Sequence, residues 1–274
     1  MIPRAQAEGV LREIGTRPDD KIDLAEGALA LAALDRPGVA LDRYRDHIKQ
    51  LAREVGRSLS KSPPTLVEAL NRIIFQSHGY RGDMLTYDDI QNANLMRVID
   101  RKKGLPVALG VLYLHAARAN GFAANGINFP GHFMICIGQD GARRIIDPFN
   151  EGAERSAADL RQLLKAMDGM EAELSPDHYA AVSNRDILMR LQNNIKARHE
   201  RAGRREDALR VVESMLMFAP GRMSLWREAG AIHARVGNLG AAIDAFQTIV
   251  ERADTDVERH DAATIIQKLR ARLN

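Results

Sequence analysis

Hydrophobic positions recur with helical spacing through the first hundred residues. Residues 41–55 place four apolar or aromatic side chains on one face, at the i, i+4, i+7 and i+11 positions of an amphipathic helix: Tyr44, Ile48, Leu51 and Val55. Thr65 and Glu68 have the spacing of a capping box, in which each side chain accepts a backbone N–H of the same first turn. Asp19 and Asp20 are predicted to cap an earlier helix. The N-terminal part is therefore expected to be helical.

The pattern changes beyond residue 104. Residues 105–119 are apolar nearly all round, as in a buried helix, and Pro106 is tolerated in its first turn because that N–H has no helical partner. Residues 132–137 then alternate as a strand does, and residues 144–147 form the returning strand after a turn at 139–141. A buried helix beside antiparallel strands predicts an α+β fold.

This predicted hairpin brings His132 and Asp147 to the same face of the sheet. A loop formed by Gln139 and Asp140 places the two residues directly opposite each other, whereas a loop formed by Asp140 and Gly141 places them diagonally. An imidazole oriented by a carboxylate is a competent general base. A three-residue loop or a bulge would separate the two residues, but in either two-residue register the sequence favours a His132–Asp147 pair.

The C-terminal part is a repeat. Residues 202–209 match residues 236–243 at an offset of 34 residues, with glycine ending one helix and alanine on the next. This period is typical of tetratricopeptide repeats. We predict repeats at about 187–220 and 221–254 and a closing helix at 258–272.

The division of the chain follows from that repeat. Residues 1–185 are expected to form one domain and residues 186–274 an all-α repeat segment. Such repeats bind protein or peptide segments through an extended surface. Asn193 and Asn194 lie on the first repeat helix and are candidate contacts to a peptide backbone.

Composition narrows the class of protein. The chain has 274 residues, of which 45% are hydrophobic and 27% charged, with a formal charge of +3. No apolar run approaches the roughly 20 residues that span a bilayer, and the densest basic cluster (198–205) has the pattern of a solvated helix face. We therefore expect neither a membrane nor a nucleic-acid partner. One cysteine excludes an internal disulfide, and the cytoplasm is the expected compartment.

An ordered set of motifs adds a family resemblance. Roughly residues 20–185 resemble the transglutaminase-like domain of bacterial SirB-type proteins, which typically also carry tetratricopeptide repeats. The resemblance rests on Asn92 and on four segments that follow it in order: residues 97–106, 109–113, 130–133 and 146–149. It implies a papain-like core, in which a helix packs on an antiparallel sheet.

The same resemblance implies a site with the chain order of a Cys-His-Asp triad. Pro106 stands at the nucleophile position, as in many members, and Ala108 stands where a serine is often found. His132 and Asp147 match the remaining two members. Tyr80 and Asn92 are expected to rim the binding cleft.

The missing thiol decides the functional prediction. The only cysteine, Cys136, is four residues beyond His132 on one strand, so their α-carbons are about 13 Å apart, too far for a nucleophile–base contact. A metal held by His132 with His78 or Asp83 lacks a recognisable ligand spacing, so neither a metal nor a cofactor is predicted.

Three uses of the His132–Asp147 pair stay open at this point: a structural pair, a base for hydrolysis by water, and part of a binding cleft. We predict a non-catalytic protein-interaction or regulatory module, that is, a pseudoenzyme. The alternative is a hydrolase or acyl-transferase that uses the pair with water or an unidentified nucleophile. A homo-oligomer is a third hypothesis.

Overall fold

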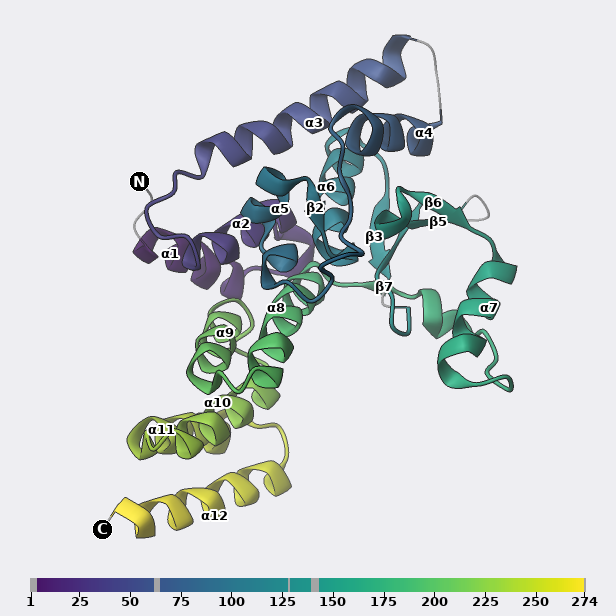
Figure 1. Cartoon of the computed structure of the whole chain (residues 1–274). Coiled ribbons are helices and arrows are strands. Elements are labelled where there is room, and N and C mark those ends of the chain that lie inside the picture. The colour runs from purple at the N-terminus through teal and green to yellow at the C-terminus, as the bar shows by residue number, and fades with distance from the viewer. Residues whose placement is uncertain (1–3, 62–64, 128, 139–142, 274) are drawn as a thin grey trace. The chain divides into compact units, whose positions relative to one another are not determined.

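The computed structural model describes residues 4–61, 65–127, 129–138 and 143–273. The chain divides into two compact units, and Figure 1 shows their elements. One unit holds residues 18–191 together with the residues before Glu8. The other holds residues 8–17 and 192–274. The predicted boundary at 185/186 lies in the first turn of the helix that links the units, and the structural division lies six residues further on, inside that helix.

Helices make up most of the first unit. In chain order they are α2 (Leu24–Leu34), α3 (Asp42–Lys61), α4 (Leu66–Asn71), α5 (Leu95–Arg101), α6 (Pro106–Ala119) and α7 (Ala157–Asp168). The predicted stripe of α3 is buried, with each of its four side chains no more than 2% exposed. The capping box of α4 forms as predicted, since Thr65 accepts the Glu68 N–H and Glu68 accepts the Thr65 N–H.

The predicted cap at Asp19 and Asp20 is wrong. These residues lie in a short 3₁₀ turn, and Asp23 caps α2 by accepting the N–H of Glu26 at 3.0 Å. Asp19 instead accepts the backbone N–H groups of Asn184 and Arg185, at 2.8 and 2.9 Å, where α8 (Asn184–Arg201) begins. A carboxylate is favourable there because the first N–H groups of a helix have no helical acceptor.

Five antiparallel strands form the sheet of this unit. Their spatial order is β6 (Ala153–Arg155), β5 (Arg144–Asp147), β4 (Met134–Ile137), β3 (Ala124–Ile127) and β7 (Ala181–Val182). A separate parallel pair joins β1 (Arg81–Gly82) to β2 (Lys103–Gly104). Helix α6 covers one face, where the Phe133 ring lies so close to Gly110 that a Cβ there would come within 2.4 Å of it. The α+β prediction, a helix packed on an antiparallel sheet, is confirmed.

Helix α7 covers the other face of the sheet. Its residues Leu160 and Leu164 pack with Met134 and other buried side chains of the sheet and the loop after β3. The β4–β5 register pairs Ile135 with Ile146 and Cys136 with Ile145. This register belongs to the diagonal alternative, and the turn residues 139–142 themselves lie outside the described residues.

The second unit consists of helices. It contains the part of α8 from Gln192 onward, followed by α9 (Arg205–Phe218), α10 (Met223–Arg235), α11 (Leu239–Arg252) and α12 (Asp256–Leu273). Gly230 allows α10 to approach α11, because a Cβ at that position would lie 2.7 Å from the Phe246 ring. Residues 8–16 of α1 (Arg4–Thr16) and the following Arg17 also belong to this unit. A Cβ on Gly15 would lie 2.4 Å from the carbonyl oxygen of Met217. Among the described residues of the whole chain, no helix is both long and apolar enough to cross a bilayer.

Candidate functional site

Helix α6 begins at Pro106, the position at which the family resemblance predicts a nucleophile. Leu105 is its N-cap residue, its N–H donates to the carbonyl of Asn92 at 2.9 Å, and Pro106 is the first helical residue. The next two residues, Val107 and Ala108, are 1% and 0% exposed. The first turn therefore offers a helix N-terminus with neither a hydroxyl nor a thiol on it.

Asp147 is buried and fully engaged. Its carboxylate accepts the N–H groups of Phe149 and Asn150 and the side-chain amide of Asn150 at 2.7 Å. The guanidinium of Arg155, one strand away on β6, donates to it at 2.7 and 3.3 Å. Asp147 thus caps the short 3₁₀ turn at 148–150 and neutralises Arg155.

His132 lies just before β4 and is half-buried. Its backbone N–H donates to the carbonyl of Phe129 at 3.0 Å, after a turn in which Gly131 has φ +64°. Among the described residues, no hydrogen bond or ion pair joins the imidazole to Asp147. The expected pair is therefore not formed as a contact, because Arg155 and Asn150 occupy the carboxylate. That the two residues form a vestigial catalytic site stays a prediction.

Cys136 lies on β4, on the face of the sheet covered by α7. Burial raises the pKa of its thiol above the usual range, with a smaller opposing effect from Arg143. A protonated thiol is a poor nucleophile. Cys136 therefore has neither the place nor the ionisation state of a triad cysteine.

Asn92 and Asp83 belong to one buried network with Arg101. The side chain of Asn92 donates to the carbonyl of Thr86 at 2.6 Å and accepts from Arg101 at 2.9 Å. Asp83 accepts from Arg101 at 3.0 Å and from both the hydroxyl and the N–H of Thr86. Burial opposes ionisation of Asp83, but the hydrogen bonds from Thr86 and the nearby cations still hold its pKa below the usual value. Since Asn92 is 0% exposed, it fixes the loop before α5, and the expectation that it rims a cleft stays untested.

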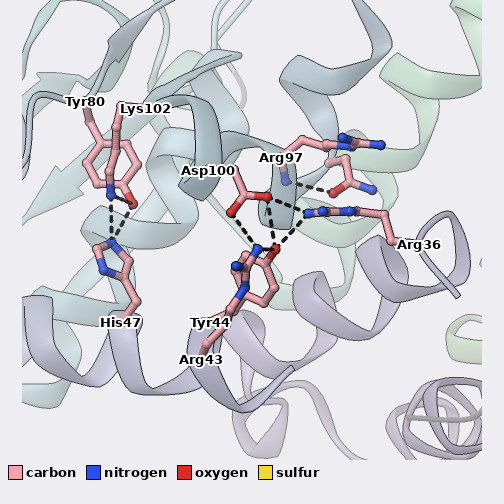
Figure 2. Close-up of polar contacts among 9 residues, drawn as sticks. Arg36, Arg43, Tyr44, His47, Tyr80, Arg97, Asp100 and Lys102 are labelled. Atoms are coloured by element: carbon pink, nitrogen blue, oxygen red, sulfur yellow. Dashed lines mark hydrogen bonds and ion pairs between the residues drawn. The ribbon is translucent and has the colours of Figure 1, made fainter. Parts of the chain in front are cut away.

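Tyr80 lies in a triangle with His47 and Lys102 (Figure 2). The Tyr80 hydroxyl is 2.7 Å from Nε2 of His47, and Nζ of Lys102 is 3.1 Å from that hydroxyl and 3.2 Å from the same Nε2. Lys102 ends α5 in the left-handed conformation at φ 58°, a conformation that a lysine adopts at a cost. Tyr80 is 1% exposed, so its hydroxyl serves the triangle and is not accessible to a ligand.

Electrostatics of the triangle favour a single positive charge. Burial lowers the pKa of His47 to about 4, with further contributions from Lys102 and His78. Burial also lowers the pKa of Lys102, and it raises the pKa of Tyr80. The imidazole is therefore neutral near pH 7, and it can accept the hydroxyl proton of Tyr80 in a hydrogen bond.

Asp100 accepts hydrogen bonds from three further residues, which are shown in Figure 2. Its carboxylate accepts from Arg36 at 2.7 Å, from Arg43 at 3.0 Å and from the Tyr44 hydroxyl at 3.0 Å. These contacts join the loop after α2 and the start of α3 to the end of α5. Together with the triangle, these contacts form a network of charged and hydrogen-bonding side chains that joins α3, α5 and the loop after α2.

The candidate residues of the repeat segment differ in their surroundings. Asn193 is exposed, whereas the side-chain oxygen of Asn194 accepts from Arg198 at 3.2 Å. Beyond them, Lys196 of α8 pairs with Glu228 of α10 at 2.6 Å, which links the first helices of the two repeats. Of the two asparagines, Asn193 is the one with a side chain available to a partner.

The residues considered as metal ligands have other partners in the structure. Within the described part of the chain, no three His, Cys, Asp or Glu side chains come together as metal ligands would. His78 instead contacts Glu54 at 2.6 Å, and Asp83 lies in the Arg101 network.

Comparison with known proteins identifies both parts of the chain. A family model described as the transglutaminase-like superfamily matches residues 42–193, and a tetratricopeptide repeat model matches residues 195–274. The chain belongs to the transglutaminase-like superfamily. The repeat prediction is confirmed by the second match.

Relatives of this transglutaminase-like protein include bacterial and human proteins. It is 32% identical to a UPF0162 protein of Vibrio cholerae, over 86% of this chain and 88% of the relative. A UPF0162 protein of Xylella fastidiosa is 29% identical, over 87% and 86% of the two chains. Human F-box only protein 21 is 25% identical over 68% of this chain, a stretch that spans 34% of the human protein.

Sequence reasoning missed several partners in the transglutaminase-like unit. The sequence analysis does not predict that Arg155 pairs with Asp147. The available signal was that the two residues are eight positions apart, on strands that could be neighbours. Nothing in one sequence indicates that His47 and Lys102 meet at Tyr80, because the three come from separate elements. Asp19 was read as a local cap, and its bonds to Asn184 and Arg185 span more than 160 residues.

Proposed function

We propose that this protein is a non-catalytic protein-interaction or regulatory module, in which the tetratricopeptide repeats bind an extended segment of a partner. The observation that carries the proposal is the start of α6. Pro106 and the buried Val107 and Ala108 leave no side chain that could attack a substrate at the position where the fold would hold its nucleophile.

The state of Asp147 supports the same proposal. A catalytic aspartate holds its histidine in one orientation, which requires a free carboxylate oxygen facing the imidazole. Here the oxygens accept from Arg155, from Asn150 and from the turn at 148–150. No observation on this site favours the competing hydrolase or acyl-transferase.

The repeat unit supplies the surface for binding. Gly230 against Phe246 and the Lys196–Glu228 pair hold the repeat helices in a fixed arrangement. A prearranged surface lowers the entropic cost of ordering a partner segment. Asn193 is exposed on the first of these helices, and a carboxamide pairs with a peptide backbone through both its donor and its acceptor.

The test is selection of peptides from a displayed random library against the full chain, followed by affinity measurement with fluorescence anisotropy. We expect enriched peptides whose affinity falls about three- to tenfold in Asn193→Ala, because one or two net hydrogen bonds are lost. Asp244→Ala, an exposed change on α11, is the matched control and should leave affinity unchanged.

A parallel assay addresses catalysis. The purified chain is incubated with a panel of amide and ester substrates, and His132→Ala is the comparison. We expect no turnover above the rate of that variant. Turnover that depends on His132, combined with failure to enrich any peptide, would overturn the proposal in favour of the hydrolase.

A further inference from the structure

A hollow lies on the face of the sheet that α7 covers. It consists of two adjoining cavities of about 420 and 330 Å³, and Cys136, Arg143 and Tyr179 line both. The chain from β6 through α7 and back to β7 encloses this side of the sheet (Figure 1). Neither Pro106 nor His132, both described residues, lines either cavity, so the hollow is separate from the position of the missing nucleophile.

The walls of the larger cavity carry an excess of positive charge. Of its four arginines, Arg155 is neutralised by Asp147, and Arg144 lies 3.6 Å from Glu154. Arg143 and Arg161 form neither an ion pair nor a hydrogen bond with any residue that the structure describes. Both side chains are exposed, and two neighbouring guanidinium groups without an acidic partner attract an anion through their combined positive field.

Apolar side chains form another part of the lining, which also contains Glu154 and Ser156. Ile145 of β5, Leu160 of α7 and Leu174 of the following loop face the same cavity, together with the ring of Tyr179. A volume of about 420 Å³ that is lined by both apolar and charged side chains has the dimensions of a site for a small amphipathic molecule. Inorganic anions fit this lining poorly, because they would leave the apolar wall in contact with water.

We propose that this cavity binds a small amphipathic carboxylate. Its anionic head pairs with Arg143 and Arg161, since guanidinium groups bind carboxylates through two parallel hydrogen bonds. Its apolar body lies along Ile145, Leu160 and Leu174. This site is independent of the repeat surface, and its test does not depend on the function proposed above.

Cys136 provides a reporter for the test. It is the only cysteine of the chain and lines both cavities, so alkylation by the neutral reagent N-ethylmaleimide reports on access to the hollow. The alkylation rate of the full chain is measured at constant pH with increasing octanoate. The neutral isostere octanamide and the short anion acetate are the two comparison ligands.

We expect octanoate to slow alkylation in a saturable way, and the two comparison ligands to protect at least about tenfold less well, since each lacks one of the two interactions. Equal protection by octanamide would remove the role of the arginines. Equal protection by acetate would remove the role of the apolar wall. Absence of any octanoate effect on both alkylation and calorimetric heat would overturn the site altogether.

Variants separate the head group from the cavity. Arg143→Gln combined with Arg161→Gln should raise the half-saturating octanoate concentration at least about tenfold. Protection is measured relative to the unliganded alkylation rate of the same variant, because loss of Arg143 removes a charge that lowers the pKa of Cys136. Arg53→Gln, an exposed change on α3, is the control and should bind like the wild type. Cys136→Ala should still bind octanoate by calorimetry, because the thiol is not the anion receptor. Unchanged binding in the double variant contradicts the proposal.

Discussion

Arg155 and Asp147 form an ion pair across two neighbouring strands, with Nη2 of the arginine 2.7 Å from Oδ2 of the aspartate. The aspartate is 3% exposed, and its oxygens also accept from the turn that follows it. The residue that would orient a catalytic histidine therefore anchors β6 and the turn at 148–150. The contribution of Asp147 to the stability of the fold can be measured by mutation.

Replacing Arg155 with alanine should destabilise the fold. The carboxylate of Asp147 would stay buried without its cation, and we expect a loss of about 1–3 kcal/mol after allowing for the partial exposure of the arginine. Urea denaturation measures the free energy of unfolding. Arg144→Ala removes the exposed pair with Glu154 and should cost less than about 0.5 kcal/mol. Equal losses of unfolding free energy in the two variants would mean that the buried Arg155–Asp147 pair stabilises the fold no more than the exposed pair does.

His132→Ala should leave stability nearly unchanged. The imidazole is half-buried, and no described residue bonds to it, so we expect a loss below about 1 kcal/mol. Asp147→Ala should cost at least about 2 kcal/mol, because Arg155 and two backbone N–H groups lose their acceptor. Thermal midpoints of the two variants give the comparison. If both lower the midpoint equally, a His132–Asp147 interaction exists after all.

His47 should make stability depend on pH. Its pKa is about 4 in the folded chain, below the ordinary value of 6.5, because burial and the neighbouring Lys102 and His78 oppose protonation, against a weaker pull from Glu54. The unfolded chain therefore binds more protons between these values, and stability falls as the pH falls from about 6.5 to 4. His47→Gln keeps a hydrogen-bond partner for Tyr80 and should remove about 1–2 kcal/mol of that fall, a figure reduced for solvent screening.

Urea denaturation at pH 7 and pH 4 measures this difference between His47→Gln and the wild type. The exposed His260 supplies the control, since His260→Gln should keep the wild-type dependence. A pH dependence that is identical in wild type and His47→Gln would exclude His47 as its source.

Gly230→Ala should loosen the repeat unit. The added methyl group would lie 2.7 Å from the Phe246 ring, and separating two packed helices costs about 1–3 kcal/mol. Gly240, in α11, has nothing within 4 Å of the same position. Gly240→Ala should therefore be neutral, or stabilise by up to about 1 kcal/mol through helix propensity. Circular dichroism during thermal unfolding distinguishes the two, and similar effects of both changes would argue against the close approach.

The fold was predictable where a signal lies within a single element. The spacing of apolar residues and the capping pattern predicted α3, α4 and α6, because these signals depend on residues close in sequence. The repeats were predictable because similar residues recur at an offset of 34 positions. The hairpin pattern left two registers open, and the structure has the diagonal one. Helix caps and hydrogen bonds between residues far apart in the sequence could not be predicted. Asp19 has the chemistry of a local N-cap, and only the three-dimensional fold shows that the helix it caps begins at Asn184.

The candidate site was predictable in position and less so in its bonding. Pro106 begins α6 as expected, and Asp147 ends its strand as expected. The partner of that aspartate depends on β6, a three-residue strand too short to carry a period. Tyr80 and Asn92 are expected from the sequence to rim a binding cleft. In the structure both are buried, and their side chains form hydrogen bonds inside the fold.

The grouping of residues 8–17 with the repeat unit has a consequence for how the chain can be divided. The second unit is assembled from two stretches separated by 174 residues of the first, which extends from Pro18 to Leu191. Proteolysis at one site before Gln192 would yield a fragment lacking the segment in which Gly15 lies against Met217. A fragment that keeps this close approach must therefore include residues 8–17 together with the repeat helices.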